Sequence, residues 1–196
     1  MGIYTDPAQP AIAPDGFLSL NVERFFDEEL RLSYLLWEEK VPPILAIEVV
    51  SQTIRGEYTK KLDLYKEMGV LYYVIYNPQR KRKPKLEIHK LVDGNYDVQD
   101  ANPLWMPEIG LGIGNDFAER TLRERASYGG VTRDWLYWYD ENGQRYPTPQ
   151  EQIELERQRA DNADRRAEDA DRLVEQERQR AERLAAQLRG LGIEPN

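Results

Sequence analysis

The sequence contains no cysteine, one histidine and no long hydrophobic run. Without cysteine the chain has no disulfide and no thiolate chemistry, which is compatible with a reducing cytosol. A zinc site or a histidine-based triad would need partners that the chain lacks, because His89 stands alone. No apolar stretch approaches the roughly 18 residues of a membrane span, and the first ten residues are not a signal peptide. We therefore expect a cytoplasmic protein with no membrane partner.

The chain also contains fewer basic than acidic residues. It has 27 Lys and Arg against 35 Asp and Glu, which gives a net charge of -8. That balance argues against broad, non-specific binding to nucleic acid. It does not exclude a nuclease, because a metal ion masks the carboxylates of a nuclease and its phosphate contacts can be local. The mean hydropathy of -0.75 is low for a compact domain of this size. The 196 residues therefore fit one domain plus an extension outside the globular core.

The chain is organised around the stretch from Pro43 to Pro78. Residues 44–50 form a short, mostly β-branched apolar run, which predicts a buried strand. Residues 58–68 carry apolar side chains three apart and end before Gly69, which predicts a helix with one apolar face and a glycine C-cap. Residues 71–76 predict a second strand. A strand, helix, strand unit normally makes its two strands parallel neighbours.

Glu48 is the anomaly in this unit, because a carboxylate inside a buried strand is costly unless it is paired or binds a cation. Asp15 lies in a turn that enters another apolar run, and Lys60 and Lys61 begin the predicted helix. We expect Asp15, Glu48 and one lysine to converge at one end of a small sheet. Two carboxylates bind a hard cation such as Mg²⁺, and a lysine beside it orients or deprotonates a water for attack on phosphorus. This is the chemistry of metal-dependent phosphodiester hydrolysis.

Only one of the two lysines can face the carboxylates, because consecutive helical residues point about 100° apart. Lys61 lies one turn before Tyr65, on a face shared by residues four apart. We predict that Lys61, and not Lys60, faces Glu48.

The order of these segments resembles the PD-(D/E)XK nuclease superfamily, and most closely its large bacterial family of restriction-endonuclease-like proteins. The matching segments are Pro14-Asp15, Ile47-Glu48-Val49-Val50-Ser51, Lys61-Leu62 with Tyr65, Gly69-Val70 and Tyr72-Tyr73-Val74. The segment 135–140 followed by Pro147-Thr148-Pro149 is similar to the C-terminal part of that family. The resemblance therefore covers most of the chain before its last 47 residues.

The resemblance implies an α/β (α+β) fold with a restriction-endonuclease-like core and a mixed sheet. The residues after this core predict, by their own composition, a long C-terminal helix. It implies that Asp15 and Glu48 are ligands of Mg²⁺, or of Mn²⁺ in its place, with the backbone carbonyl of Val49 as a third ligand. Lys61 would be the catalytic lysine, which in this family stands in the helix after the strand. DNA would be the substrate of a metal-dependent endonuclease.

One departure from the family pattern gives an alternative. Members usually carry a helix and strands before the Pro-Asp turn, and only 13 residues precede Pro14. We therefore expect an N-terminally shortened member. The alternative function is a catalytically inactive remnant of the nuclease fold that acts as an interaction module through its helical tail.

A basic run at residues 80–85 lies on the loop that leaves the second predicted strand. It either contacts phosphates or is a solvated loop that offsets local acidity, and no aromatic residue interleaves it to stack on bases. The Asp93-Gly94 pair between two β-rich runs predicts a hairpin. The lone His89 falls within that hairpin and is expected to be structural or exposed.

The glycines at 110, 112 and 114 lack the Lys-Ser/Thr of a phosphate loop. They indicate instead a short strand that approaches its neighbour closely. Residues 129–148 are rich in Trp and Tyr and contain the turn Asn142-Gly143, which predicts a small hairpin.

From Thr148 the composition changes to Glu, Asp, Arg, Gln and Ala without Gly or Pro until Gly190. Thr148 as N-cap, Pro149 as first residue and Glu151 as the third form a capping box, which predicts one long helix. Apolar residues recur every seven positions, at Ile153, Ala160, Ala167, Val174, Ala181 and Leu188. Such heptads favour a coiled coil that pairs weakly because its seam is mostly Ala, with a solitary solvated helix as the alternative. The chain is thus divided into a nuclease-like core (1–128), an aromatic hairpin (129–148) and a helical tail (149–196).

Overall fold

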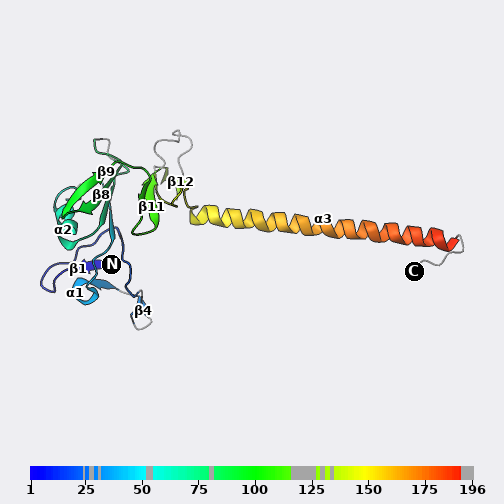
Figure 1. Ribbon diagram of the computed structural model, residues 1–196, viewed down its shortest axis with the longest axis horizontal. Helices are drawn as coiled ribbons and strands as arrows, with labels where there is room; N and C mark the ends of the chain where they lie inside the picture. Colours follow the sequence, from blue (N-terminus) through cyan, green and yellow to red (C-terminus); the bar gives the residue numbers. More distant parts are fainter. Residues whose placement is uncertain are drawn as a thin grey trace. The chain divides into compact units, whose positions relative to one another are not determined.

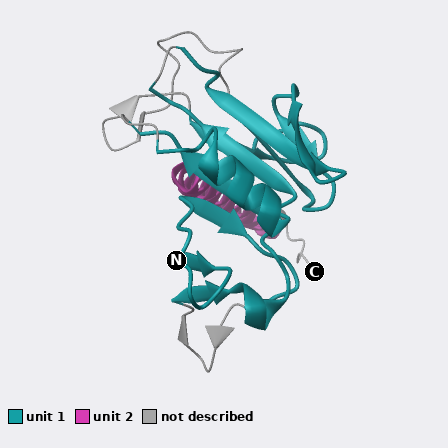
Figure 2. Cartoon of the chain, turned by 90° about the vertical axis from the view of Figure 1, so that its left-hand side faces the viewer, with its two compact units in different colours: residues 1–146 teal, residues 147–196 magenta. Residues whose placement is uncertain are grey.

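The computed structural model describes residues 1–23, 25–26, 29–30, 32–51, 55–79, 82–115, 127–128, 131–132 and 135–190. The chain forms two compact units, Met1–Tyr146 and Pro147–Asn196, which Figure 2 shows in teal and magenta. Each unit is described by itself below.

The centre of the first unit is a mixed five-stranded sheet of order β2-β6-β7-β8-β9. Its strands are β2 (Gly16–Leu18), β6 (Leu45–Val49), β7 (Tyr72–Tyr76), β8 (Leu86–Val92) and β9 (Asn95–Gln99). Strands β6 and β7 are parallel and the other neighbours are antiparallel. Helix α2 (Lys60–Met68) connects the parallel pair and ends at Gly69, whose φ is 81°. The predicted strand, helix, strand unit and the mixed sheet are confirmed.

The two faces of this sheet are both buried, because side chains alternate along each strand. Helix α2 lies against one face (Figure 1), where it packs through Tyr65 on Ala46, Tyr73 and Ile75. The near-continuous apolar sequence of β7, in which every residue is buried, is what a strand covered on both faces requires.

The opposite face is covered by a second, antiparallel sheet of order β10-β11-β14. Its strands are β10 (Leu104–Met106), β11 (Leu111–Asn115) and β14 (Leu136–Tyr139). Glu108 follows β10 and accepts hydrogen bonds from Lys90 Nζ (2.8 Å) and Tyr72 Oη (2.6 Å) of the first sheet. These two hydrogen bonds lower the pKa of Glu108 to about 2 and tie the sheets together.

The remaining elements are peripheral. Strand β1 (Gly2–Tyr4) pairs in parallel with β5 (Ser33–Leu35), which runs into the short helix α1 (Leu36–Glu39). Two small antiparallel pairs complete the first unit: β3 (Phe25–Phe26) with β4 (Glu29–Leu30), and β12 (Ser127–Tyr128) with β13 (Val131–Thr132).

The predicted turns occur where the sequence placed them. Asp93 and Gly94 both have positive φ, 48° and 78°, and join β8 to β9 as a tight hairpin. In the Trp- and Tyr-rich segment, β14 turns at residues 140–143 and bridges back from Tyr139 to Arg145. Residues 129–130 and 133–134 of the predicted aromatic hairpin lie outside the described residues.

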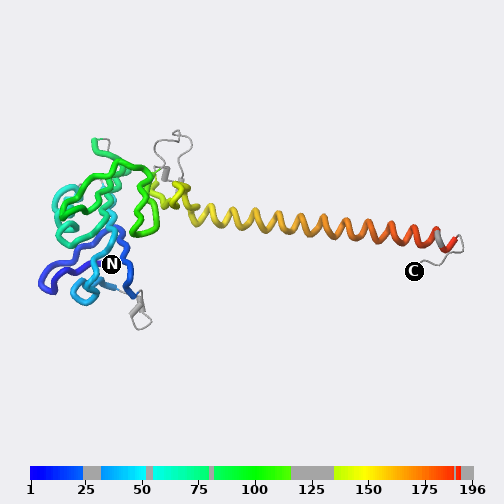
Figure 3. Tube along the Cα trace, viewed as in Figure 1, coloured from blue at the N-terminus to red at the C-terminus, as the bar shows by residue number. Residues whose placement is uncertain are grey.

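The second unit is one continuous helix, α3 (Pro149–Gly190), which Figure 3 traces from yellow to red. The predicted capping box is confirmed: Glu151 N–H donates to Thr148 Oγ1 (3.3 Å), and Thr148 N–H donates to Glu151 Oε2 (2.8 Å). Acidic and basic side chains three apart form ion pairs along the helix, such as Glu175 with Arg178 (3.0 Å). The side chain of Leu188, the last predicted seam residue, lies outside the described ones. No helix in the described part of the chain combines the length and apolar character that crossing a bilayer requires.

Gly114 in β11 provides a test of the packing between β11 and the chain before β10. A Cβ at Gly114 would lie 2.7 Å from Pro103 Cα and 2.6 Å from Asn102 Oδ1, which is too close for either backbone to remain in place. Gly16, also in a strand, has only ordinary contacts of 3.8 Å with Ile47. We expect Gly114→Ala to lower the free energy of unfolding by roughly 2 kcal/mol or more. Gly16→Ala should change it by less than about 1 kcal/mol in the same urea titration. Equal midpoints for the two variants would contradict the close approach.

Candidate active site

Glu48 is buried on the face of β6 that α2 covers, and both of its carboxylate oxygens have donors from that helix. Lys61 Nζ donates to Oε2 at 2.6 Å, and Tyr65 Oη donates to Oε1 at 2.7 Å. Glu48 is 1 % exposed, whereas the Lys61 side chain is 25 % exposed. The two donors lie four residues apart, one helical turn, so one short helix face holds the whole carboxylate.

The electrostatics of this pair are dominated by burial. Desolvation raises the pKa of Glu48, and the hydrogen bonds from Lys61 and Tyr65 oppose that rise. Burial and the hydrogen bond to Glu48 also raise the pKa of Tyr65, so Tyr65 remains a neutral donor at physiological pH.

Asp15 reaches the same end of the sheet from β2. Its Oδ2 accepts a hydrogen bond from the Val49 backbone N–H at 2.7 Å, and its side chain is exposed. The register of β2 on β6 pairs Gly16 with Ile47. Extended by two residues, this register places Pro14 opposite Val49.

Pro14 explains why a backbone carbonyl is left available here. In an antiparallel pair of this kind the two opposed residues exchange N–H to carbonyl hydrogen bonds. Proline has no N–H, so it cannot donate to the Val49 carbonyl, and the Asp15 carboxylate accepts the Val49 N–H instead. The N–H and carbonyl of one extended residue point to the same side of the strand, so the Val49 carbonyl points toward Asp15.

Residues 55–57, which lead into α2, are held by hydrogen bonds. Tyr73 Oη donates to the Glu57 carbonyl at 2.7 Å, and the buried Glu57 accepts the Arg55 N–H at 2.6 Å. Residues 52–54 lie outside the described residues. These contacts set where α2 begins, and therefore where Lys61 points.

The structure brings Asp15, Glu48 and Lys61 together at one sheet end, with Lys61 rather than Lys60 on Glu48. The geometric expectations for these residues are thus met, and their roles in catalysis are treated below. Tyr65 was missed as part of the site, since its spacing indicated only an apolar helix face. The available signal was its position one turn after Lys61, opposite a carboxylate with a second oxygen to satisfy.

The donors at this end of the sheet fit a hard divalent cation that keeps most of its waters. They are two carboxylates, one on the rim and one buried, and a backbone carbonyl on the Asp15 side. Within the described ranges, no cluster of three or more His, Cys, Asp or Glu side chains is placed to hold a metal ion. A metal here would therefore depend on the Val49 carbonyl and on water for its remaining ligands.

The family model of Uma2, described as putative restriction endonucleases, matches residues 1–120, more than half of the chain. This protein belongs to the Uma2 family. Through Uma2 it belongs to the PD-(D/E)XK nuclease superfamily, as the order of its segments indicated. No match was found among curated proteins or among solved structures.

The Uma2 match contains every residue of the candidate site. It also contains the whole five-stranded sheet and ends after β11, so β14 and α3 lie beyond it. The family assignment therefore supports a nuclease fold for the first unit and says nothing of the tail.

Removing the charge of Glu48 tests whether its ion pair with Lys61 stabilises the fold. We expect Glu48→Gln to leave the metal-free protein at least as stable as the parent, because a buried ionised carboxylate is replaced by a neutral amide that Tyr65 can still contact. Tyr65→Phe should instead lower the free energy of unfolding by about 1–3 kcal/mol, since one buried Glu48 oxygen loses its donor. Urea unfolding in EDTA near neutral pH measures both changes. A larger loss for Glu48→Gln than for Tyr65→Phe would show that the ion pair is a net stabilising interaction.

Proposed function

We propose that this Uma2 protein is a Mg²⁺-dependent DNA endonuclease that hydrolyses phosphodiester bonds, with Mn²⁺ able to replace Mg²⁺. The observation that carries the proposal is the juxtaposition of Asp15, Glu48 and Lys61 at one sheet end, with Glu48 in a buried position that stability alone does not favour. The family assignment to a nuclease superfamily supports the same chemistry.

In this proposal Asp15, Glu48 and the Val49 carbonyl hold the metal ion. When bound there, a divalent ion would supply positive charge to polarise the phosphate and to lower the pKa of the attacking water. Tyr65 holds the Glu48 carboxylate in one orientation, which leaves Lys61 as the partner that is open to solvent. Lys61 orients the attacking water and offers positive charge to the phosphate, while the water oxygen replaces one ester oxygen on phosphorus.

Loss of plasmid nicking tests the proposed roles. We expect Glu48→Gln, Asp15→Asn and Lys61→Met each to reduce Mg²⁺-dependent nicking on the order of 100-fold or more, because each removes a group that acts on the reacting atoms. Lys40→Met is the control, since Lys40 is exposed and precedes β6, toward the opposite end of that strand from Glu48, and it should retain activity. Circular dichroism checks that every variant is folded.

Two results would overturn the proposal. Equal nicking by the parent and the Glu48 variant would assign the activity to a contaminant or to another site. No metal-dependent cleavage by the folded parent chain would favour the alternative, a catalytically inactive nuclease fold that acts as an interaction module through its tail.

We further propose that the tail pairs weakly with α3 of a second copy, as a parallel and in-register coiled coil. Its seam side chains are exposed where the structure describes them, for example Ile153 at 63 % and Val174 at 68 %. Parallel heptads bring each residue before the seam beside the partner residue five positions on. That pattern matches Arg159 with Asp164 and Arg166 with Asp171, which are opposite in charge.

Charge reversal tests this arrangement in the full-length chain. We expect the double variant Asp164→Arg and Asp171→Arg to reduce the average mass seen by light scattering at high concentration, because each new arginine meets Arg159 or Arg166 of the partner. Mixing it with the reciprocal variant, Arg159→Asp and Arg166→Asp, should restore association. An unchanged mass in the reversed variant would instead support the solitary solvated helix.

A further inference from the structure

A basic surface adjoins the candidate active site on the side of the loop that joins β7 to β8. We propose that this surface, formed by Arg55, Lys60, Arg82 and Lys83, binds the phosphate backbone of duplex DNA beside Glu48. The inference deepens the proposed nuclease function and rests on it. This inference places the DNA backbone on one side of the candidate active site.

The strand register places this loop next to the site. Val49 pairs with Tyr76, and Tyr76 pairs with Leu86, so these residues form one row across β6, β7 and β8. Neighbouring strands are about 4.8 Å apart, so the start of β8 lies about 10 Å from Val49. The β7–β8 loop therefore leaves the same sheet edge at which Asp15, Glu48 and Lys61 converge. Phosphates next to the scissile one along a strand fall within that reach.

Part of the positive charge of the first unit is already paired with carboxylates of the chain. Lys61, Lys66 and Lys90 each form an ion pair with a carboxylate of the chain. In the residues that the structure describes, no carboxylate forms such a pair with Arg55, Lys60, Arg82 or Lys83, and all four are exposed.

This difference matters because the chain carries a net charge of -8, which repels DNA over most of its surface. Unpaired cations concentrated at one edge give the backbone a local place to bind, and they release condensed counterions when it does.

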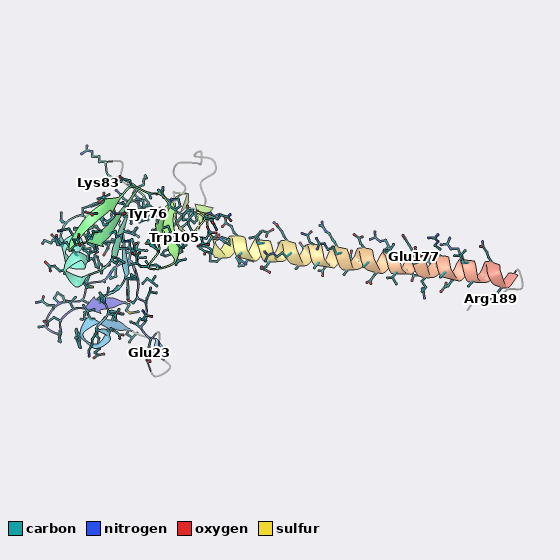
Figure 4. The ribbon with its side chains drawn as sticks, viewed as in Figure 1. Glu23, Tyr76, Lys83, Trp105, Glu177 and Arg189 are labelled. Atoms are coloured by element: carbon teal, nitrogen blue, oxygen red, sulfur yellow. The ribbon has the colours of Figure 1, made fainter. Side chains whose placement is uncertain are left out.

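The two ends of this loop are held together. Lys85 Nζ donates to the Pro78 carbonyl at 2.6 Å, and the Asn77 N–H donates to the Lys85 carbonyl at 2.8 Å, which closes the base of the loop. Lys83 Nζ lies 4.6 Å from the centre of the Tyr58 ring, in the segment that leads into α2. Figure 4 places Lys83 at the periphery of the first unit. Arg80 and Lys81, the other members of the predicted basic run, lie outside the described residues.

The Tyr58 contact indicates that phosphates, and not bases, are recognised here. An aromatic ring that stacks a base must offer an open face. Lys83 lies over one face of the Tyr58 ring, and the ring also packs against the core cluster that contains Tyr65 and Tyr73. The ring thus positions a cation for the backbone, and contacts of this kind fix register without reading sequence.

The other side of Lys61 does not compete for the backbone. A groove of about 520 Å³ lies there, between α2 and the N-terminal segment, and it is lined by Leu64, Glu67 and residues such as Gln9 and Ile12. Lys61 is its one basic lining residue, and Glu67 repels phosphate. The charge distribution around the site is therefore one-sided.

Binding of a short fluorescein-labelled duplex, measured by anisotropy, tests the surface. The Glu48→Gln chain is the background, so that hydrolysis does not interfere. We expect Lys83→Glu to weaken binding roughly five- to tenfold. It should also flatten the slope of log K against log salt by about 1 between roughly 50 and 200 mM NaCl, because one phosphate contact is lost. Lys83→Arg, which keeps the charge, should bind like the background.

Lys40→Glu is the charge-matched control. Lys40 is exposed and precedes β6, so it lies toward the opposite end of that strand from Glu48, and its reversal should leave the affinity and the slope unchanged. Equal losses of affinity for Lys40→Glu and Lys83→Glu would show that the effect comes from net charge alone, and would overturn the proposed surface. If Lys83→Glu binds the duplex as tightly as the Glu48→Gln chain, the proposed surface is also overturned. The same holds if the Glu48→Gln chain does not bind the duplex at low salt. Lys83-dependent binding by a parent chain that does not cleave DNA would uphold the surface and overturn the proposed nuclease function alone.

Discussion

The buried carboxylate of Glu48 is the constraint on which the arrangement of the first unit depends. A charge in the middle of a packed sheet face must have a donor for each oxygen, and both donors come from the first two turns of α2. The position of α2 along β6 and the rotation of α2 about its own axis are therefore both fixed. Tyr73 and Glu57 secure that placement by holding the chain just before the helix. The sheet, the residues just before α2 and α2 itself are therefore all arranged around the Glu48 side chain.

Such an arrangement is costly for a purely structural purpose. An apolar residue at position 48 would pack between Ala46 and Val50 without requiring Lys61 or Tyr65 to be positioned. Burial raises the pKa of Glu48, and the hydrogen bonds from Lys61 and Tyr65 act against that rise. A cation bound by this carboxylate would be a further compensating interaction, which is the role that the proposed function assigns to it.

Features that depend on neighbouring residues could be predicted from the sequence. The glycine cap of α2, the Asp93-Gly94 turn and the Thr148-Glu151 capping box each follow from a few adjacent side chains, and the structure contains all three. The choice of Lys61 over Lys60 follows from helix geometry alone. Convergence of Asp15 with Glu48 was predicted because a carboxylate inside a buried strand is costly unless it is paired or binds a cation.

Features that depend on register could not be predicted in the same way. The opposition of Pro14 and Val49 appears only when β2 is aligned on β6, and the link from Tyr72 to Glu108 joins two sheets. Tyr65 was taken as apolar because its hydroxyl partner lies 17 residues away. His89 was expected to be structural or exposed; it is buried, with its Nε2 2.9 Å from Glu87 Oε1, and its ring stacks on Tyr73.

The distribution of aromatic residues gives the molecule two separate optical reporters. Trp37, Trp105 and Trp138 lie in α1, β10 and β14, and Trp135 directly precedes β14, so tryptophan emission comes from the periphery and the second sheet. The face beside Glu48 contains Tyr65, Tyr73 and Tyr96 and no tryptophan. Near-ultraviolet dichroism therefore includes a contribution from the surroundings of the carboxylate that tryptophan emission does not contain. Comparing the two signals during denaturation tests whether the first sheet and the second sheet unfold in one cooperative transition.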